Sequence, residues 1–412
     1  MKIAIIGGGA AGFFAAVNIK KLTPLAEVTI YEGSHKVLTK VGVSGGGRCN
    51  LSNSFEDIKN LVQAYPRGEK LMKRAFKIFD QKNTYDWFEE NGVKLTTQSD
   101  NCVFPVSQDS QEIIDTLLAL AKKFYITVKT DHKISSIEKL DSGFVITTDN
   151  PENPTVESDI VVVTTGGSPR IEGLSMLDKL PLDIEKPVPS LFSFNIPDNS
   201  ITELTGAVIE NATVGIQGTK TRVTGSILIT HWGVSGPAIL KLSSYAARTL
   251  SDMDYEAKIT VNWVSVFKEQ EVLDELEYIA KHNSQKYTYS ARPYNLTARF
   301  WEHILLQANV SRERRWAELG RKGVNRIVNA LMADEYTIDG KSTFKEEFVT
   351  CGGVSLQSIN QNTMEAKDVE DLYLAGEVLD IDAITGGFNL QAAWSTAYVV
   401  ADSIAQKASA KI

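Results

Sequence analysis

Cysteine and histidine are both scarce in this chain of 412 residues. The three cysteines, Cys49, Cys102 and Cys351, are odd in number and far apart in the sequence. This pattern excludes the paired disulfide framework of small secreted proteins, and we expect a cytoplasmic location. The five histidines form no group with cysteines or acidic residues at ligand spacing, so no metal site is predicted.

Long apolar runs and an excess of positive charge are also missing. No stretch of 18 apolar residues occurs, and a membrane span is therefore not expected. Acidic residues outnumber basic ones by 51 to 43, which gives a net charge of −8. This balance makes nucleic acid or an anionic membrane an unfavourable main partner and favours a small-molecule substrate.

The first residues carry a glycine pattern typical of dinucleotide binding. The apolar run Ile3 to Ile6 predicts a buried parallel strand, and a helix is expected over Phe13 to Leu22. Between them, Gly7 permits a tight turn, Gly9 lets a pyrophosphate approach the backbone, and Gly12 lets the helix pack closely on the strand. The N-terminal N–H groups of that helix would hold the phosphates.

A second expected strand, Val28 to Tyr31, ends at Glu32. Glu32 lies 20 residues beyond Gly12, where an acceptor for a ribose hydroxyl is expected. The alternative is a glycine-rich turn that binds nothing. Because strand, turn, helix, strand and acid all have the required spacing, the sequence predicts a bound dinucleotide.

Two further stretches of glycine suggest backbone lying against a ligand. Ser44 to Asn50 reads SGGGRCN, and its consecutive glycines are costly to order in an ordinary core. We interpret it as backbone against a flat ligand, with polar contacts from Arg48 and Asn50; the alternative is a flexible surface loop. Near the C-terminus, Gly386 and Gly387 precede an expected helix whose free N–H groups could face a flavin.

The middle of the chain has a different character. Short alternating segments between residues 191 and 263 predict an antiparallel sheet or small barrel, and residues 267–335 have a helical pattern. Prolines at 181, 187 and 189 suggest a linker before this region. The predicted domains are a dinucleotide-binding domain of residues 1–187 and 349–412, a β-barrel insert of residues 188–265 and 336–348, and a helical subdomain of residues 266–335.

These residues resemble a bacterial family of FAD-dependent oxidoreductases labelled aminoacetone-oxidase-like or 3-dehydro-bile-acid-reductase-like. The resemblance extends over nearly the whole chain, and its most specific motifs are SGGGRCN and GEVLD with TGGFNLQ. The full set is GGGAAG at 7–12, SGGGRCNLSN at 44–53, VFPVS at 103–107, ITHWGVSGPAIL at 229–240, CGGV at 351–354, TMEAK at 363–367 and LYLAGEVLDIDAITGGFNLQAAWSTA at 372–397.

The resemblance implies an α/β fold, with a Rossmann-type, glutathione-reductase-like FAD domain built from both chain ends. The central insert would carry an antiparallel β-barrel and a small helical subdomain. Carried over position by position, the FAD contacts would be Gly7, Gly9, Ala11, Gly12, Glu32, Lys40, Gly47, Arg48, Ile134, Gly166, Gly376, Glu377, Gly387, Asn389, Leu390 and Gln391.

The chain departs from the family pattern at two places. The family usually has Gly-Arg-Lys before the SGGGRCN loop, whereas this chain has Leu38-Thr39-Lys40. After the strand at 159–164, residues 168–180 read SPRIEGLSMLDKL in place of a longer glycine-rich run. Whatever that run builds in the family is not transferred to this chain.

Three residues are candidates for contact with the substrate: His231, Arg48 and Asn50. His231 would donate a proton or a hydrogen bond, or it would only hold the turn before Pro237. Arg48 and Asn50 would bind substrate or cofactor. Cys49 has no partner at the spacing of a redox disulfide, so we interpret it as a small buried thiol near the flavin.

The predicted activity is hydride transfer through flavin N5 to or from a small organic substrate. The favoured form is NAD(P)H-dependent reduction of an activated C=C or carbonyl; with no second GxGxxG in the chain, NAD(P)H would dock transiently. One alternative is an amine or aminoketone oxidase that uses O2. Another is a flavin-containing RNA-binding or assembly protein, suggested by six basic residues between Arg312 and Arg326. That cluster would otherwise be a solvated helix face or a site for NAD(P)H phosphates.

Overall fold

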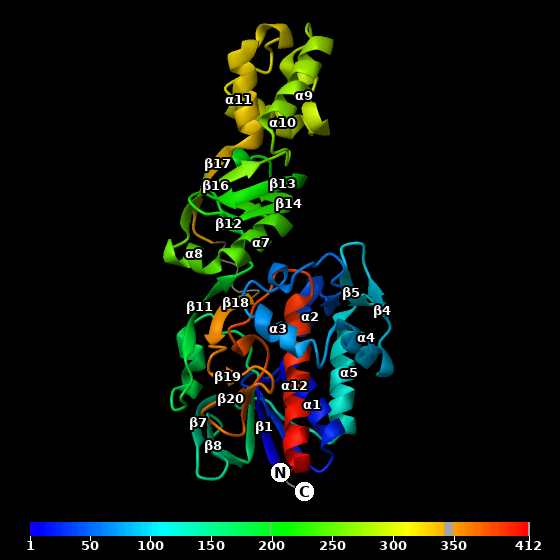
Figure 1. Ribbon diagram of the computed structural model, residues 1–412, viewed down its shortest axis with the longest axis vertical. Helices are drawn as coiled ribbons and strands as arrows, with labels where there is room; N and C mark the ends of the chain where they lie inside the picture. Colours follow the sequence, from blue (N-terminus) through cyan, green and yellow to red (C-terminus); the bar gives the residue numbers. More distant parts are fainter. Residues whose placement is uncertain (198, 342–348, 411–412) are drawn as a thin grey trace. The chain divides into compact units, whose positions relative to one another are not determined.

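The protein divides into two compact units, shown in Figure 1. The computed structural model describes residues 1–197, 199–341 and 349–410. Unit 1 contains Met1–Pro189 and Val349–Ile412, and unit 2 contains Ser190–Phe348. Unit 1 is thus formed by both ends of the chain, and unit 2 is inserted between them.

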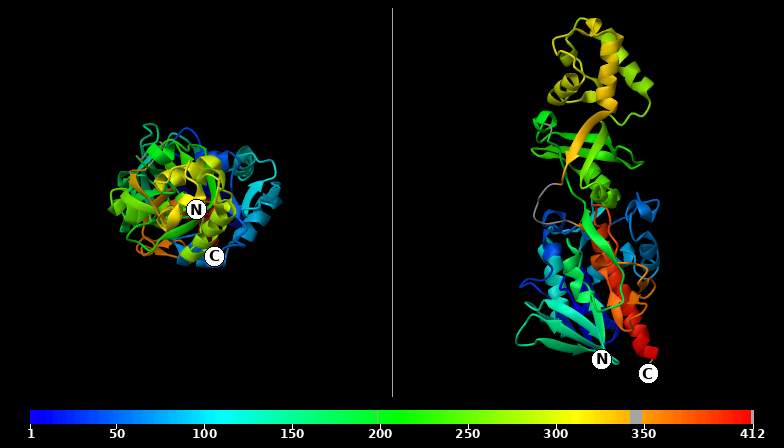
Figure 2. Two further views of the ribbon diagram at one scale, coloured as in Figure 1. Left: turned by 90° about the horizontal axis from the view of Figure 1, so that it is seen from above. Right: turned by 90° about the vertical axis from the view of Figure 1, so that its left-hand side faces the viewer.

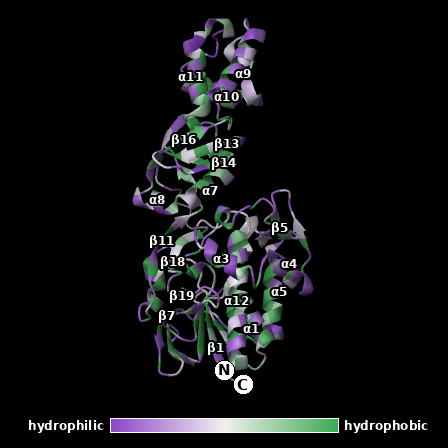
Figure 3. Ribbon diagram, viewed as in Figure 1, coloured by the Kyte–Doolittle hydropathy of each residue, from purple (hydrophilic) through white to green (hydrophobic). Residues whose placement is uncertain are grey.

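Unit 1 is built on a seven-stranded sheet with β1 (Lys2–Ile6) near its centre. Four of the five residues of β1 are buried, because β10 and β2 pair with it in parallel on its two sides. Figure 3 shows the strands around β1 as hydrophobic. The order is β19 (Ile359–Asn360), β20 (Glu365–Ala366), β21 (Leu372–Leu374), β10 (Ile160–Val163), β1, β2 (Glu27–Tyr31) and β6 (Thr127–Lys129).

Two helices from opposite ends of the chain pack against each other in unit 1. These are α1 (Ala10–Leu22) and α12 (Phe388–Ala410), which lie side by side in Figure 1. Phe14 of α1 contacts Trp394 of α12 with ring centroids 5.2 Å apart. The sequence predicted α12 from Ala392, and the helix in fact begins at Phe388. The N-terminus and the last turn of α12 lie close together in all views (Figures 1 and 2).

Smaller elements surround this core. Asp109 caps α5 (Ser110–Lys123) by accepting a hydrogen bond from the N–H of Gln111. The remaining elements of unit 1 are α2 (Thr39–Val43), α3 (Glu69–Ala75), α4 (Gln81–Glu90), the sheet of β3 (Ser52–Asn53), β5 (Cys102–Pro105) and β4 (Leu95–Thr97), the sheet of β7 (Ile134–Lys139), β8 (Phe144–Thr148) and β9 (Thr155–Ser158), and the pair β11 (Ile184–Ser190) and β18 (Val349–Val354).

Unit 2 contains a six-stranded antiparallel sheet that nearly closes into a barrel. Its edge strands approach each other, because Asn195 N–H donates to Gly340 O at 3.2 Å and Phe194 bridges to Lys341. The order is β12 (Phe194–Asn195), β15 (Gly233–Ser235), β14 (Arg222–Thr230), β13 (Val208–Ile216), β16 (Glu256–Asn262) and β17 (Asp334–Asp339). After Gly236 the chain forms two successive helices, α7 (Pro237–Tyr245) and α8 (Ala247–Asp252).

Unit 2 also contains the short helix α6 (Asn199–Thr202) and three longer helices, α9 (Glu269–His282), α10 (Ala298–Gln307) and α11 (Gly320–Met332). The helical pattern expected to reach Glu335 ends earlier, since β17 begins at Asp334. Asp334 points inward and accepts hydrogen bonds from Trp263 Nε1 and the Tyr336 hydroxyl. Buried and exposed residues alternate along β17, but the first buried residue is the acidic Asp334. The alternation of apolar and polar residues that marks a strand is therefore hard to recognise in the sequence.

A helix that crosses a bilayer must be long and apolar, and the helices of the described ranges can be judged by both properties. None of these helices is both long and apolar enough to cross a bilayer.

Candidate functional site

The turn after β1 leaves an open space at one glycine and tight packing at two others. Gly7 has φ +111°, and a Cβ atom there would lie 2.5 Å from Thr164 O. A Cβ atom at Gly12 would lie 2.0 Å from Gly7 O, so only glycine lets α1 sit this close to the strand. At Gly9, by contrast, a Cβ atom would meet nothing within 4 Å. The turn is therefore tightly packed at Gly7 and Gly12, whereas the space beside Gly9 is open.

The N-terminus of α1 is arranged for an anion. Gly9 is its N-cap, with no capping side chain and no acidic residue in the first turn. The N–H groups of a first turn have no partner within the helix, and the helix dipole is positive there. Glu32 follows β2 and accepts a hydrogen bond from Gly8 N–H at 2.8 Å and another from Ser34 N–H at 2.9 Å. Its half-buried carboxylate has room for a ribose hydroxyl as well.

The SGGGRCN segment forms a tight loop of left-handed residues. Gly45, Gly46 and Gly47 have φ values of +57°, +70° and +85°, which other residues adopt only with strain. Cβ atoms at Gly46 and Gly47 would meet nothing within 4 Å, so the exposed side of this loop is bare backbone. The Leu38-Thr39-Lys40 departure lies at the start of α2, where Leu38 has φ +58°.

Arg48 and Asn50 both hold this loop. Arg48 donates to Gly45 O at 3.1 Å and to Gln108 Oε1 at 3.3 Å, and its guanidinium lies 4.3 Å from the centre of the Phe104 ring. The Asn50 amide donates to Ser52 O and accepts from Gly387 N–H once its oxygen and nitrogen are assigned to satisfy both. The loop is thereby fixed to β5 and to the start of α12.

Cys49 lies within this loop and is fully buried. Burial raises the pKa of its thiol to about 12, and a hydrogen bond from Ser44 lowers it by a smaller amount. The thiol is therefore protonated and unreactive near neutral pH. All three cysteines are buried free thiols, which agrees with the interpretation of Cys49 as a packing residue.

Gly376 and Glu377 follow β21 and meet α1 and the residues after β10. A Cβ atom at Gly376, which has φ +75°, would lie 3.1 Å from the Cβ of Ala11. Glu377 accepts from Lys40 Nζ at 2.9 Å. Gly166 lies beside the Glu377 carboxylate, because a Cβ atom built on Gly166 would lie 3.8 Å from Glu377 Oε2. Five predicted cofactor residues are thus brought together here, from four separate stretches of the chain.

Four further predicted cofactor residues lie at the start of α12: Gly387 just before the helix, and Asn389, Leu390 and Gln391 in its first turn. Gly387 has φ +86°, and a Cβ atom there would lie 2.2 Å from Ser52 O. Gln391 is fully buried and bonds to Ser52 Oγ and Thr84 Oγ1, while the Asn389 amide makes two hydrogen bonds with the backbone of Ala383. Leu390 is half-buried. Asn389 and Gln391 thus hold the shape of the site through their side chains.

Ile134 begins β7 and is buried. Its neighbour Lys133 packs on Gly33, with 3.2 Å between the Lys133 Cβ and a would-be Cβ at Gly33. Ile134 therefore lies just beyond the end of β2, near Glu32.

An ion pair that the sequence did not reveal orders the segment before α12. Arg67 forms two hydrogen bonds with the carboxylate of Asp382, and the exposed fractions of the two side chains are 12% and 0%. The residues are 315 positions apart, and Arg67 lies outside every motif of the family resemblance. Only spatial proximity identifies it.

His231 lies in unit 2, whereas the residues above all belong to unit 1. His231 occupies the two-residue turn between β14 and β15, and its ring is exposed. The imidazole and the Trp232 ring are nearly perpendicular, with their centroids 4.3 Å apart. The described residues include none that hydrogen-bonds to its imidazole. The turn is instead held by backbone pairing and by Thr230, whose hydroxyl donates to Gly233 O.

The unit 1 residues fit a flavin adenine dinucleotide. The vacant space beside Gly9 and the uncapped helix suit its pyrophosphate, and Glu32 suits its ribose. The bare backbone of Gly46 and Gly47 and the N-terminus of α12 suit a flat ring that gains negative charge on reduction. The described residues contain no group of three or more histidine, cysteine or acidic side chains that could hold a metal.

Comparison with known proteins agrees with this assignment. A family model described as "HI0933-like protein Rossmann domain" matches residues 1–403. A 3-dehydro-bile acid delta(4,6)-reductase of Clostridium scindens is 25% identical over 98% of this chain and 99% of its own length. Ribosomal RNA dihydrouridine synthases of Haemophilus influenzae and Escherichia coli are 25% and 27% identical, each over 98% of both chains.

Solved structures of flavoenzymes share the fold. A 3-ketosteroid delta1-dehydrogenase from Sterolibacterium denitrificans aligns with a TM-score of 0.53 at 12% identity, over 98% of this chain and 99% of the other. A 3-ketosteroid-delta4-(5alpha)-dehydrogenase from Rhodococcus jostii aligns with a TM-score of 0.52 at 14% identity, over 98% and 96%. The expected α/β fold with a Rossmann-type FAD domain and a barrel insert is confirmed.

Proposed function

Because the chain belongs to the HI0933-like Rossmann family and is an FAD-dependent oxidoreductase, we propose that it reduces a C=C bond conjugated to a carbonyl group. The observation that carries this proposal is a chemical step common to the two activities named for its relatives. A delta(4,6)-reductase of a 3-dehydro-bile acid saturates double bonds conjugated to the 3-oxo group. A dihydrouridine synthase saturates the C5=C6 bond of uracil, which is conjugated to the C4 carbonyl.

Uracil in RNA is the first candidate substrate. Two of the relatives described above are named for that activity, and each matches this chain over 98% of both lengths. A steroid-like 3-oxo-diene is the second candidate, supported by the relative from Clostridium scindens. In both cases one carbon of the double bond accepts hydride and the other accepts a proton.

NAD(P)H is the proposed electron donor. FAD held by the turn at Gly9, by Glu32 and by the bare backbone of Gly46 and Gly47 would supply hydride transfer between this donor and the substrate. The balanced reaction converts NAD(P)H, a proton and the C=C bond into NAD(P)⁺ and a saturated CH–CH bond. Arg48 and Asn50 act in this proposal by holding the bare glycine backbone in place, because their polar groups already bond within the loop.

The test is anaerobic oxidation of NADH or NADPH by the FAD-loaded protein with each substrate in turn. We expect consumption of donor with uridine-containing RNA, and formation of dihydrouridine detected by mass spectrometry. Reduction of a 3-oxo-4,6-diene steroid but not of RNA would favour the second substrate. Failure with both substrates, or peroxide release with an amine in air, would contradict the proposal and favour the oxidase alternative.

His231 is the proposed proton donor, since its imidazole is exposed and histidine is the side chain most often used as a general acid. We expect His231→Ala to lower turnover by about 10²-fold, as for loss of a general acid. FAD content should not change. His282→Ala is the matched control, because His282 is also exposed and bonds through Nδ1 to the Tyr278 backbone. Equal turnover in both variants would remove His231 from the reaction.

A further inference from the structure

We propose that α11 and the pocket beside it form a binding surface for single-stranded RNA. This inference rests on the RNA form of the proposed function, and it assigns the part of unit 2 that would hold the polynucleotide. The surface is defined by five exposed residues of α11, the last residue of α10 and one residue just after it: Arg321, Lys322, Asn325, Arg326, Asn329, Gln307 and Asn309.

The charge of this region is opposite to that of the chain as a whole. Residues 281–332 contain ten Lys or Arg and three Asp or Glu, a net charge of +7, in a chain whose net charge is −8. The overall acidity therefore conceals a local excess of positive charge. Steering of a polyanion depends on the local field rather than on the total charge.

The exposed face of α11 contains only cations and amides. At 3.6 residues per turn, positions 321, 322, 325, 326 and 329 fall within a face about 140° wide. The opposite face, with Gly323, Ile327 and Leu331, is buried in the core of unit 2. The acidic residues nearest in sequence lie outside α11: Glu313 and Glu318 precede the helix, and Asp334 and Glu335 follow it.

The cations of this face are available for a ligand. Arg312 is paired with Glu302, Arg314 bonds to Glu318 O, and Arg315 bonds to Gln285. Within the described ranges, Arg321, Lys322 and Arg326 form no ion pair or hydrogen bond through their side chains. Three unpaired cations on one face suit a run of phosphates, whereas the three preceding arginines are already engaged within the fold.

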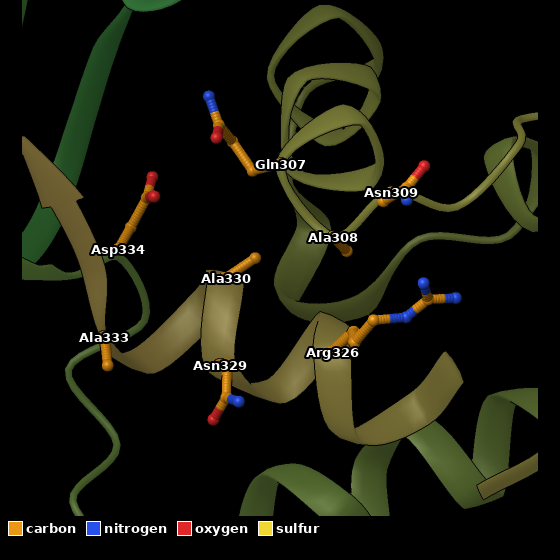
Figure 4. A pocket seen from close by; sticks show the side chains of 8 residues that line it. All are labelled: Gln307, Ala308, Asn309, Arg326, Asn329, Ala330, Ala333 and Asp334. Atoms are coloured by element: carbon orange, nitrogen blue, oxygen red, sulfur yellow. The ribbon is translucent and has the colours of Figure 1, made fainter. Parts of the chain in front are cut away.

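A polar pocket adjoins these cations (Figure 4). Its volume is about 320 Å³, and it lies between the end of α10 and the last turns of α11. Gln307, Asn309 and Asn329 contribute amides to its wall, while Ala308, Ala330 and Ala333 leave its surface free of bulky side chains. Amides both donate and accept hydrogen bonds, as the edge of a nucleobase requires.

The charges around the pocket determine which part of a nucleotide it suits. Arg326 lies at one end and Asp334 at the other (Figure 4). The Asp334 carboxylate would repel a phosphate inside the pocket, so the neutral base or ribose should enter and the phosphate should remain with Arg326. An anionic lipid surface would make no use of such a pocket, which favours RNA as the partner.

The test measures binding of a fluorescently labelled oligouridine by the full FAD-loaded protein without electron donor. We expect the Arg321→Gln, Lys322→Gln, Arg326→Gln triple variant to bind at least about 10-fold more weakly at moderate salt. The slope of log affinity against log salt should fall by about 2, the value expected for the loss of three phosphate contacts to a single strand.

The matched control removes three exposed lysines from unit 1: Lys82→Gln, Lys94→Gln and Lys122→Gln. It changes the net charge equally and should alter affinity by no more than about twofold if only the α11 face contacts RNA. Asn309→Ala with Asn329→Ala should weaken binding of oligouridine but not of an abasic strand, with the salt slope unchanged.

Equal weakening in the triple variant and its control would overturn the assignment of this surface. So would absence of RNA binding by the wild-type protein at low salt, or preferential binding of phosphatidylserine vesicles that the triple variant loses. These outcomes are separate from the proposed reaction, because reduction of a small conjugated substrate does not need this surface.

Discussion

Replacing Gly9 by valine is expected to give a folded protein that has lost its flavin. A Cβ atom at Gly9 meets no protein atom within 4 Å, and Gly9 has φ −93°, which valine adopts readily. The isopropyl group would instead occupy the space that the pyrophosphate needs at the start of α1. We expect FAD affinity to fall by on the order of 10²-fold, equal to ~2.7 kcal/mol.

The experiment compares Gly9→Val with Gly12→Val. At Gly12 a Cβ atom would lie 2.0 Å from Gly7 O, so valine there should disrupt the packing of α1 on β1. Gly12→Val should cost ~3 kcal/mol of unfolding free energy even without flavin, whereas Gly9→Val should cost little. Circular dichroism and urea unfolding measure the fold, and titration followed by flavin fluorescence measures binding. Wild-type FAD affinity in Gly9→Val would refute the pyrophosphate assignment.

Removal of Arg67 is expected to cause a large loss of stability in unit 1. Asp382 is fully buried, and Arg67 supplies two charge-assisted hydrogen bonds to its carboxylate. Breaking such a pair leaves a carboxylate in a medium of low dielectric constant without its counter-charge. We expect Arg67→Ala to lower the free energy of unfolding by about 3–5 kcal/mol.

Arg74→Ala is the matched control for this prediction. Arg74 is exposed on α3 and donates one side-chain hydrogen bond, to Gln361. Its replacement should change stability by about 0.5 kcal/mol or less, as at most surface positions. The double replacement Arg67→Leu with Asp382→Leu should be less harmful than Arg67→Ala, since neither charge remains. If Arg67→Ala unfolds no more easily than Arg74→Ala, the ion pair contributes little to the fold.

Local positive charge on unit 2 was visible in the sequence but could not be interpreted there. The net charge of −8 made nucleic acid an unfavourable partner, and the basic residues between Arg312 and Arg326 had an ordinary alternative as a solvated face. In the structure three of those arginines are engaged in intramolecular contacts. The other three basic residues, Arg321, Lys322 and Arg326, share a face of α11 with Asn325 and Asn329, and this face adjoins the pocket that Arg326 and Asn329 line.

The sequence alone determined the cofactor domain, because its requirements are local. A tight turn, a close strand–helix contact and a bare helix N-terminus each depend on residues a few positions apart, and glycine spacing reports them directly. The same locality explains why the helix behind Gly386 and Gly387 and the SGGGRCN loop were identified.

Only the tertiary structure decided the contacts between distant residues. Arg67 forms an ion pair with Asp382, which is 315 positions away, and Lys40 forms one with Glu377, which is 337 positions away. No pattern in the sequence predicts either pair. Asp334 was hidden as the start of a strand because a buried acid needs partners, here Trp263 and Tyr336, that alternation of hydrophobicity does not reveal. The energy of an ion pair or hydrogen bond depends on the distance between its two groups and on their burial. Neither quantity can be read from the sequence, because both depend on how distant segments pack.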